Sequence, residues 1–262
     1  MKKFKIRHYT VACNAGACNA EACNAGANGG EATPLRFAMV SDLHRARYGE
    51  GQCDLMNAIA QEQPAAILMC GDIFHYKPTQ GSREFLQAAA ARYPCYFVTG
   101  NHETRSDEAD ELKAFIRSLG IHVLEGDCEV FEWGGRRVNI CGIEEPYVIG
   151  REAMHRQLAA ASEASRNGNF TVLLAHRPER IRDYLSYDFD LILAGHAHGG
   201  QWRIPGILDG FFASGQGFFP KYTGGRYDFG DKTMILGRGL TRYTHFVPRI
   251  FNPPELVILD LV

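Results

Sequence analysis

From about residue 35 onward, short apolar runs alternate with amphipathic stretches. Apolar runs that end in turn residues are typical of buried strands, whereas apolar residues spaced three and four apart predict helices. The predicted buried strands cover residues 35–42, 65–72, 95–102, 170–178 and 190–198. The predicted helices cover residues 53–63, 82–93, 107–120, 151–168 and 179–188, and Ser82 is the expected cap of the second helix. This alternation predicts an α/β fold with stacked layers of helix and sheet.

The pattern changes in two later regions. Residues 128–146 predict a hairpin that turns at Gly134 and Gly135. The last third of the chain is rich in Gly, Pro and aromatic residues, which predicts long loops before a final strand at residues 254–262. Residues 225–232 imitate a phosphate-binding loop but lack its lysine, so we assign them no nucleotide site.

Residues 13–32 repeat a Cys-Asn-Ala pattern in units of five. One hypothesis is a soft-metal site formed by Cys13, Cys18 and Cys23. The favoured interpretation is a low-complexity linker or loop over residues 12–34, because the cysteines lack the close pairing of structural zinc sites and the repeat has little apolar surface.

The composition limits the remaining possibilities. The chain has 262 residues, with 28 basic and 30 acidic residues and a formal net charge of -2, so we expect one domain over residues 1–262 and no general affinity for nucleic acid. The N-terminal lysines are not followed by the apolar region of a signal peptide, and no run of 18 apolar residues occurs. We therefore expect a cytoplasmic protein without a transmembrane segment, while the oligomeric state stays open.

Each of the five predicted buried strands ends in polar residues that can bind metals. Because ligands bind outside the carboxyl ends of strands in open α/β sheets, these residues are expected to meet. A mixture of Asp, His and Asn side chains suits manganese, iron or zinc. The five groups are Ser41-Asp42-Leu43-His44, Gly71-Asp72, Gly100-Asn101-His102-Glu103, His176-Arg177 and Gly195-His196-Ala197-His198.

The motifs D-x-H, GD, GNHE, H and GHxH, in this order, resemble those of the calcineurin-like metallophosphoesterase superfamily. The match runs from about residue 36 to the C-terminus. The stretches GHAHGGQWRIPG and GQGFFPKYTGG further resemble a bacterial branch of small phosphodiesterases and relatives that cleave a lipid A precursor. The resemblance implies a four-layer α/β/β/α sandwich with two central mixed sheets and a site at the carboxyl ends of the strands.

The resemblance also implies two metal ions, divalent or of mixed valence, which are manganese, iron or zinc. The implied ligands of the first ion are Asp42, His44, Asp72 and His198. Those of the second ion are Asp72, Asn101, His176 and His196, so Asp72 bridges the pair. We expect His196 and His198 to reach different ions because side chains two residues apart in an extended stretch point the same way.

Two cations about 3.5–4 Å apart can hold a hydroxide between them and clamp phosphate oxygens. His102 is not an implied ligand, and we expect it to aid the leaving group, because histidine titrates close to neutral pH.

Glu103 either orients a ligand or simply begins the next helix. We expect His75 to lie in a solvent-facing loop. Arg45, Arg177 and Arg203 either bind a substrate phosphate or form surface ion pairs.

These features predict a metal-dependent hydrolase of phosphodiester or pyrophosphate bonds in a small-molecule or lipid-linked substrate. The alternatives are a nuclease on the same fold and a non-catalytic metal-binding scaffold protein. Peripheral contact with a membrane is compatible with the sequence. The aromatic side chains of residues 210–230 either bind an apolar substrate or pack beneath a long loop, and packing is the favoured interpretation.

Overall fold

Two six-stranded sheets form the centre of the protein in a computed structural model, which describes residues 4–13, 34–106, 108–244 and 247–262. In the first sheet β2 to β5 are parallel to one another, while the last strand β16 is antiparallel to β2 and parallel to β1. Its strands, in spatial order, are β1 (Lys5–Val11), β16 (Glu255–Leu261), β2 (Leu35–Val40), β3 (Ala66–Cys70), β4 (Cys95–Val98) and β5 (His122–Val123).

The second sheet is also mixed. Its four inner strands are parallel, and an antiparallel strand closes each edge. The strands, in spatial order, are β12 (Gly225–Phe229), β13 (Lys232–Leu236), β9 (Leu191–Ala194), β8 (Phe170–Leu174), β7 (Arg136–Gly142) and β6 (Cys128–Trp133).

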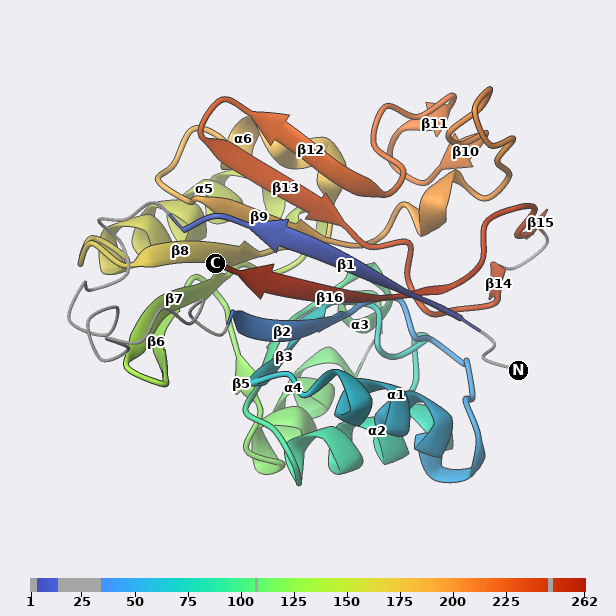
Figure 1. Ribbon diagram of the computed structural model, residues 1–262, viewed down its shortest axis with the longest axis horizontal. Helices are drawn as coiled ribbons and strands as arrows, with labels where there is room; N and C mark the ends of the chain where they lie inside the picture. Colours follow the sequence, from blue (N-terminus) through green and yellow to red (C-terminus); the bar gives the residue numbers. More distant parts are fainter. Residues whose placement is uncertain (1–3, 14–33, 107, 245–246) are drawn as a thin grey trace, which may run out of the picture.

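Alternating side chains along the strands create three apolar cores. In β2, Phe37 and Met39 pack between the two sheets, whereas Ala38 and Val40 pack toward the helices, as the period of two in a strand requires. Helices α1 (Cys53–Glu62), α2 (Gln80–Ala90) and α4 (Ala109–Ser118) cover the first sheet. Helices α5 (Pro146–Ala164) and α6 (Ile181–Tyr184) cover the second sheet. This arrangement confirms the predicted four-layer sandwich (Figure 1).

Short elements after the central strands surround one end of the sandwich. The short strands β10 and β11 project from this end in the upper right of Figure 1. The short elements are η1 (Glu50–Gln52), α3 (Asn101–Thr104), η2 (Pro178–Arg180), η3 (His198–Gly200), β10 (Phe212–Ala213), β11 (Gly217–Phe218), β14 (Tyr243–Thr244) and β15 (Val247–Pro248). None of the described helices combines the length and hydrophobicity that a membrane span requires.

Several predicted boundaries are wrong because local capping and turns end the elements early. The strand predicted over residues 95–102 stops at Val98, and Asn101 already begins helix α3. The strand predicted over residues 190–198 stops at Ala194. Thr79 caps α2 in place of Ser82, which instead supplies the reciprocal bond of the capping box.

The loop-rich last third contains more sheet than its composition predicts. β12 and β13 form the hairpin at residues 225–236, which extends the second sheet. The aromatic residues nearby differ in burial. Tyr222 is buried against that sheet, as the packing interpretation predicts. Phe218 and Phe219 are exposed, so the packing interpretation is wrong for these two residues. Cys18 and Cys23 of the hypothetical soft-metal site lie outside the described residues, as does most of the alternative linker over residues 12–34.

Candidate metal centre

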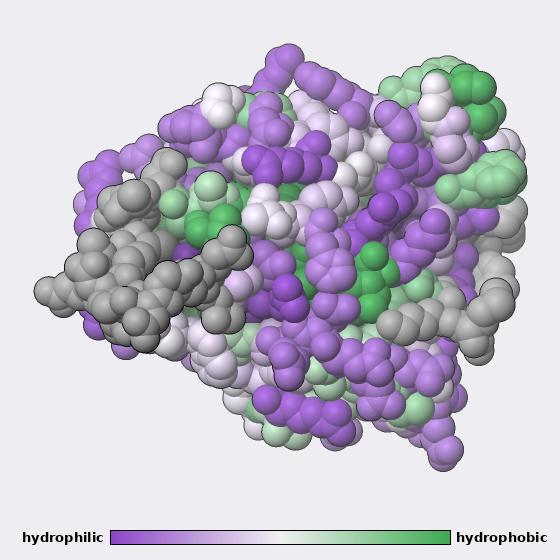
Figure 2. Space-filling view, in the orientation of Figure 1, coloured by the Kyte–Doolittle hydropathy of each residue, from purple (hydrophilic) through white to green (hydrophobic). Residues whose placement is uncertain are grey.

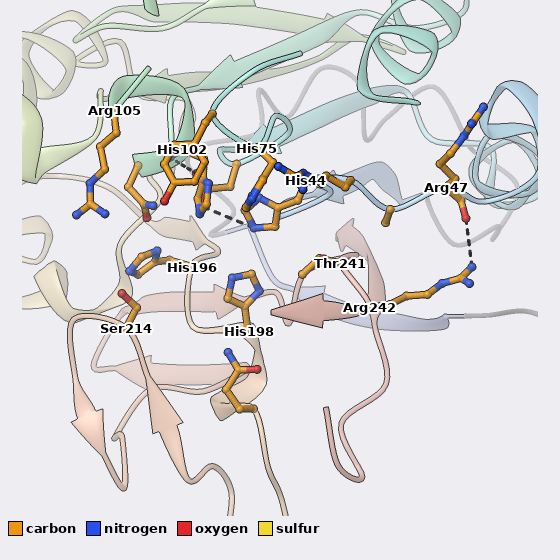
Figure 3. A pocket seen from close by; sticks show the side chains of 16 residues that line it. His44, Arg47, His75, His102, Arg105, His196, His198, Ser214, Thr241 and Arg242 are labelled. Atoms are coloured by element: carbon orange, nitrogen blue, oxygen red, sulfur yellow. Dashed lines mark hydrogen bonds and ion pairs between the residues drawn. The ribbon is translucent and has the colours of Figure 1, made fainter. Parts of the chain in front are cut away.

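The metal-capable side chains meet in a cavity at the carboxyl ends of the strands. The cavity has a volume of about 750 Å³, which is within the usual range for small-molecule sites. Its lining includes His44, Asp72, Asn101, His196 and His198. In Figure 3, the histidines point toward one another across this cavity, with Arg105 at one end and Arg242 at the other.

Among the described residues, three groups of donor atoms could each hold a metal ion, and two of them contain an aspartate. Within each group they lie within 4.8 Å of one another. Asp72 joins the groups, because its Oδ2 lies 3.2 Å from His176 Nε2 and 3.8 Å from His44 Nε2. Donor atoms that share one ion lie within about 4 Å of each other, which is twice a typical bond length. The two groups that contain an aspartate are Asp42, His44 and His198, and Asp72, His176 and His196; the third group is His44, His75 and His102, which has no carboxylate.

Asn101 provides a separate test of whether these residues fit metal ions. Its Oδ1 is buried and has no hydrogen-bond partner among the described residues. An unsatisfied buried acceptor costs about 1–3 kcal/mol, and a cation within reach of this oxygen would remove that cost. The orphaned oxygen and the Asp, His and Asn donors therefore fit the pair of ions that the sequence motifs imply.

The backbone is strained where it presents these ligands. Asp42, His44 and Asp72 have φ angles of 50°, 51° and 55°, and His196 and His198 have φ angles of 69° and 48°. Residues with a side chain rarely adopt this left-handed region, and each such residue costs on the order of 1 kcal/mol. Strain concentrated in one cavity is typical of a functional site.

This geometry changes the explanation for the two histidines of the GHxH motif. His196 and His198 do not lie on an extended strand, because Ala197 between them is helical, with φ -74° and ψ -12°. The two side chains nevertheless belong to different donor groups. Left-handed turns at both positions, rather than a two-residue strand repeat, direct them there.

Backbone carbonyls orient two of the ligand rings. His44 Nδ1 lies 3.2 Å from the carbonyl oxygen of Phe74, and His176 Nδ1 lies 2.7 Å from that of Cys70. A hydrogen bond at Nδ1 leaves Nε2 as the metal-binding atom, which is the usual arrangement in metalloproteins.

Arginines lie behind the other two ligand histidines. Arg177 Nη1 is 2.9 Å from His196 Nε2, and Arg249 Nη2 is 3.4 Å from His198 Nδ1. Burial, together with neighbouring cations, lowers the pKa of both histidines well below its ordinary value. Burial also lowers the pKa of His44 to about 3. These rings are therefore neutral at pH 7, the form in which imidazole binds metals.

The carboxylates respond differently to burial. Burial raises the pKa of Asp42 to about 6. Burial would also raise the pKa of Asp72, but the charge of His176 and the hydrogen bond with it hold that pKa well below its usual range. Asp72 is therefore an anion, as a ligand shared by two cations has to be.

Glu103 holds the backbone around Asp72. Its Oε2 accepts hydrogen bonds from the N–H groups of Asp72 and Gly100 at 2.9 and 2.8 Å, and its Oε1 accepts one from Phe74 at 2.8 Å. Burial and the neighbouring Asp72 raise the pKa of Glu103 to about 7. Of the two roles left open by the sequence, these contacts favour the one in which Glu103 orients a ligand.

Two glycines allow this part of the chain to pack closely. A Cβ atom on Gly71 would lie 2.6 Å from His176 Nδ1, and one on Gly100 would lie 2.3 Å from Asp72 Oδ1. Gly71 also has a φ of 81°. Any side chain at either position would displace a ligand.

His102 lies inside the cavity under a set of aromatic rings. Its backbone N–H donates to Asp72 Oδ1 at 2.8 Å, and its Nε2 is 4.0 Å from Asp72 Oδ2. The ring of His75 stacks on it with centroids 4.6 Å apart, and Tyr76 lies at 4.3 Å. The expectation of a solvent-facing His75 is therefore wrong: His75 is half-buried and lines the cavity, a contact that sequence spacing does not reveal.

The three arginines predicted to bind substrate occupy different places. Arg45 is exposed and lines the cavity. Arg177 is buried, bonds to Glu145 and Glu179, and is absent from the cavity lining.

Arg203 is also absent from that lining and donates to Asp209 at 2.9 Å. Of the three, only Arg45 lines the cavity as a substrate-binding side chain would, whereas Arg203 forms the surface ion pair of the alternative interpretation. Sequence reasoning missed Arg105, Thr241 and Arg242, which line the cavity but have no motif of their own.

A two-sheet sandwich with paired Asp/His donor groups at its strand ends defines the class of two-metal hydrolases. Residues 35–200, more than half of the chain, match the family model of the calcineurin-like phosphoesterases. The chain belongs to this family, and the predicted family resemblance is confirmed.

Curated relatives cover most of this chain. It is 26% identical over 243 residues to the phosphodiesterase YaeI of Escherichia coli, a match that covers 88% of this chain and 83% of the relative. It is also 26% identical to the uncharacterized metallophosphoesterase Cj0846 of Campylobacter jejuni, covering 87% of this chain. The chain spans only 59% of the length of that second relative.

The sandwich also resembles a solved structure. The NAD nucleotidase of Haemophilus influenzae superimposes with a TM-score of 0.52 at 16% identity. The match covers 80% of this chain and 46% of the nucleotidase chain, so it supports the fold alone.

Proposed function

We propose that the protein is a metal-dependent hydrolase of phosphodiester or pyrophosphate bonds. The observation that carries this proposal is the placement of Asp72 between two groups of donor atoms. Membership of the calcineurin-like phosphoesterases and similarity to a protein named a phosphodiesterase support it. Loss of a donor would mark a non-catalytic scaffold on this fold, and all of the predicted donors are present in this chain.

The first ion would be held by Asp42, His44, Asp72 and His198, and the second by Asp72, Asn101, His176 and His196. When bound, a pair of manganese, iron or zinc ions supplies Lewis acidity and a water that is reactive at neutral pH. The remaining chemistry belongs to the chain. Asp72 and Glu103 hold the ligands in place, and the arginines of the cavity attract the anionic substrate.

His102 is the proposed proton donor to the leaving group. It lies in the cavity, within 4.0 Å of Asp72 Oδ2, yet it belongs to neither implied ligand set. Contacts with His75 and Tyr76 restrict its ring and exclude water from its faces. A positioned donor of this kind contributes typically about 10²–10⁴-fold to the rate.

The substrate is proposed to be a small-molecule or lipid-linked phosphoester. Arg45, Arg105 and Arg242 line the cavity, and a guanidinium can bind a phosphate group through two hydrogen bonds. A nuclease is not favoured, because the net charge of -2 gives no general footprint for a nucleic-acid backbone. A cytoplasmic location stays a prediction.

The test is hydrolysis of bis(p-nitrophenyl) phosphate with Mn²⁺. We expect His102→Ala to lower kcat by about 10²-fold or more and to retain bound metal, because His102 acts on the leaving group. His122→Ala is the matched control, since His122 is exposed on β5 outside the cavity lining. Full turnover by His102→Ala would contradict the assigned role. A wild-type protein that binds no metal and hydrolyses no phosphoester would refute the proposed function.

A further inference from the structure

Exposed apolar side chains concentrate at one place on the protein. Eight of the fourteen large hydrophobic residues that are exposed among the described residues fall within residues 202–219 and 250–251, which we call the apolar lobe. Ile207, Phe218, Phe219 and Phe251 are 84%, 66%, 68% and 72% exposed. A contiguous apolar surface of this kind marks an interaction site more often than chance exposure.

Hydrogen bonds and ring contacts within the apolar lobe hold its exposed side chains in place. The N–H of Phe211 donates to the carbonyl of Trp202, and the N–H of Phe219 donates to the carbonyl of Phe211. The ring of Phe211 stacks on Trp202 with centroids 5.3 Å apart and contacts Phe218 edge-on at 5.3 Å. Phe211 therefore fixes the exposed rings around it.

The apolar lobe adjoins the metal centre. Ser214, from the turn between β10 and β11, lines the cavity, and so does Gln201, which immediately precedes the lobe. Figure 2 shows hydrophobic residues gathered at the upper right, over the position of β10 and β11 in Figure 1. A partner that covers this surface would lie beside the mouth of the cavity.

Positive charge accompanies the apolar surface. Lys221 is exposed just after the lobe, and Arg45 and Arg105 are exposed at the cavity. None of these three side chains has a carboxylate within ion-pair distance among the described residues. The exposed acid of the lobe, Asp209, is paired with Arg203. Lys221 therefore adjoins the lobe, while Arg45 and Arg105 line the cavity beside it. Exposed apolar side chains combined with cations favour binding to anionic lipid surfaces.

We propose that the apolar lobe docks on the surface of an anionic lipid bilayer, with Ile207, Phe218, Phe219 and Phe251 entering the interface. The unpaired cations disfavour a second copy of this chain as the occupant, because the same charges would face each other across the contact. Docking would bring the cavity to the membrane surface, where phosphoesters with acyl chains reside. This last point rests on the proposed function, but the docking itself does not.

The two tryptophans of the chain allow a direct test. Trp202 lies in the apolar lobe, and Trp133 lies on β6, an edge strand of the second sheet. Each can be made the only tryptophan by replacing the other with phenylalanine. With vesicles of brominated phosphatidylglycerol, we expect quenching of Trp202 in the Trp133→Phe protein and no quenching of Trp133 in the Trp202→Phe protein. Equal quenching of both, or of neither, would overturn the proposal.

Sedimentation with vesicles provides a second measurement. The double variant Phe218→Ser, Phe219→Ser should lose roughly 100-fold in partition to phosphatidylglycerol vesicles, since each buried phenylalanine is worth about tenfold. Val130→Ser on β6 is the matched control, because Val130 is also exposed but lies outside the lobe. Binding that is unchanged in the double variant, or undiminished on vesicles of phosphatidylcholine alone, would contradict docking to an anionic surface.

Hydrolysis, melting and oligomeric state distinguish lost docking from damage to the fold or the cavity. Without vesicles, the double variant should hydrolyse bis(p-nitrophenyl) phosphate at the wild-type rate and melt as wild type does, because neither ring lines the cavity. A wild-type dimer in analytical ultracentrifugation that the double variant abolishes would assign the lobe to a second copy and refute the proposal. Absence of hydrolysis by the wild type would refute the proposed function and leave the docking result standing.

Discussion

At the scale of residues, the site depends on contacts that hold Asp72 between two groups of donors. Its carboxylate faces His44, His102 and His176, while Glu103 fixes its backbone. The charge of Asp72 outweighs burial at His176 and raises the pKa of that histidine to about 10. Burial keeps His44, His196 and His198 neutral, and the backbone is strained at the same three residues. Bound cations would offset the cost of both.

Glu103→Gln should lower metal affinity by about 10–100-fold, the usual effect of removing a group that orients metal ligands. The carbonyl oxygen of glutamine can still accept on one side, but its NH₂ cannot accept the backbone N–H on the other, so the unfolding free energy should fall by about 1–3 kcal/mol. Metal titration and chemical denaturation measure the two effects. Glu132→Gln on β6 is the control, since Glu132 is exposed and pairs with Arg137 at the surface. An unchanged metal affinity in Glu103→Gln would show that the hydrogen bonds of Glu103 are not needed to orient the ligands.

Replacement of His196 and His198 should remove different ions. Each single alanine variant should retain about one ion per chain, as measured by elemental analysis, because each histidine belongs to one donor group. The double variant His176→Ala, His196→Ala should also retain one ion, whereas His196→Ala, His198→Ala should retain none. If either single variant lost both ions at equal metal concentration, the division into two groups would be wrong.

At the scale of elements, turns and caps decide where the strands stop and therefore where the ligands lie. The order and type of the main strands and helices follow from hydrophobic periodicity, which is why the predicted hairpin at residues 128–146 and the final strand are found. Hydrophobic periodicity carries less information about where each strand or helix ends. The strand predicted through His198, for example, stops at Ala194, and the backbone has already turned at His196.

The cap of α2 offers a quantitative check at this scale. Thr79 accepts the N–H of Ser82 at 3.2 Å and forms a capping box with it. Thr79→Ala should lower the unfolding free energy by about 1 kcal/mol, and Tm by roughly 2–4 °C in a protein of this size. Calorimetry measures the change. Ser118→Ala, at the exposed end of α4, should change stability by less than about 0.5 kcal/mol. Equal losses of unfolding free energy in the two variants would show that Thr79 contributes no more to stability than an exposed residue at a helix end.

At the scale of the whole molecule, the two sheets carry ligands from strands distant in the sequence to one cavity. Asp42 and Asp72 come from the first sheet, whereas His176 and His196 come from the second. Ions bound between them would link the two sheets, so metal binding and global stability should be coupled.

Removal of metal with a chelator should therefore lower Tm, and addition of Mn²⁺ or Zn²⁺ should restore it. At a free metal concentration 100 times Kd, each ion stabilises the fold by about 2.7 kcal/mol. Differential scanning calorimetry measures the shift. Asp72→Asn should show a much smaller response, since it weakens both donor groups. A chelator that leaves the wild-type Tm unchanged would argue against metal ions bound between the sheets.

The sequence by itself determined the α/β class, the order of the main elements and the family, because buried strands and five short motifs are local patterns. It also indicated which side chains would meet, since strand ends in such folds share one edge. Only the tertiary structure decided how they meet. Four features depend on neighbours far away in the chain. They are the left-handed turns at His196 and His198, the hydrogen bonds of Glu103 to the backbone around Asp72, the stacking of His75 on His102 and the burial of Arg177. The exposure of Phe218 and Phe219 belongs with them, because an aromatic residue packs inside or faces outward according to the surface beside it.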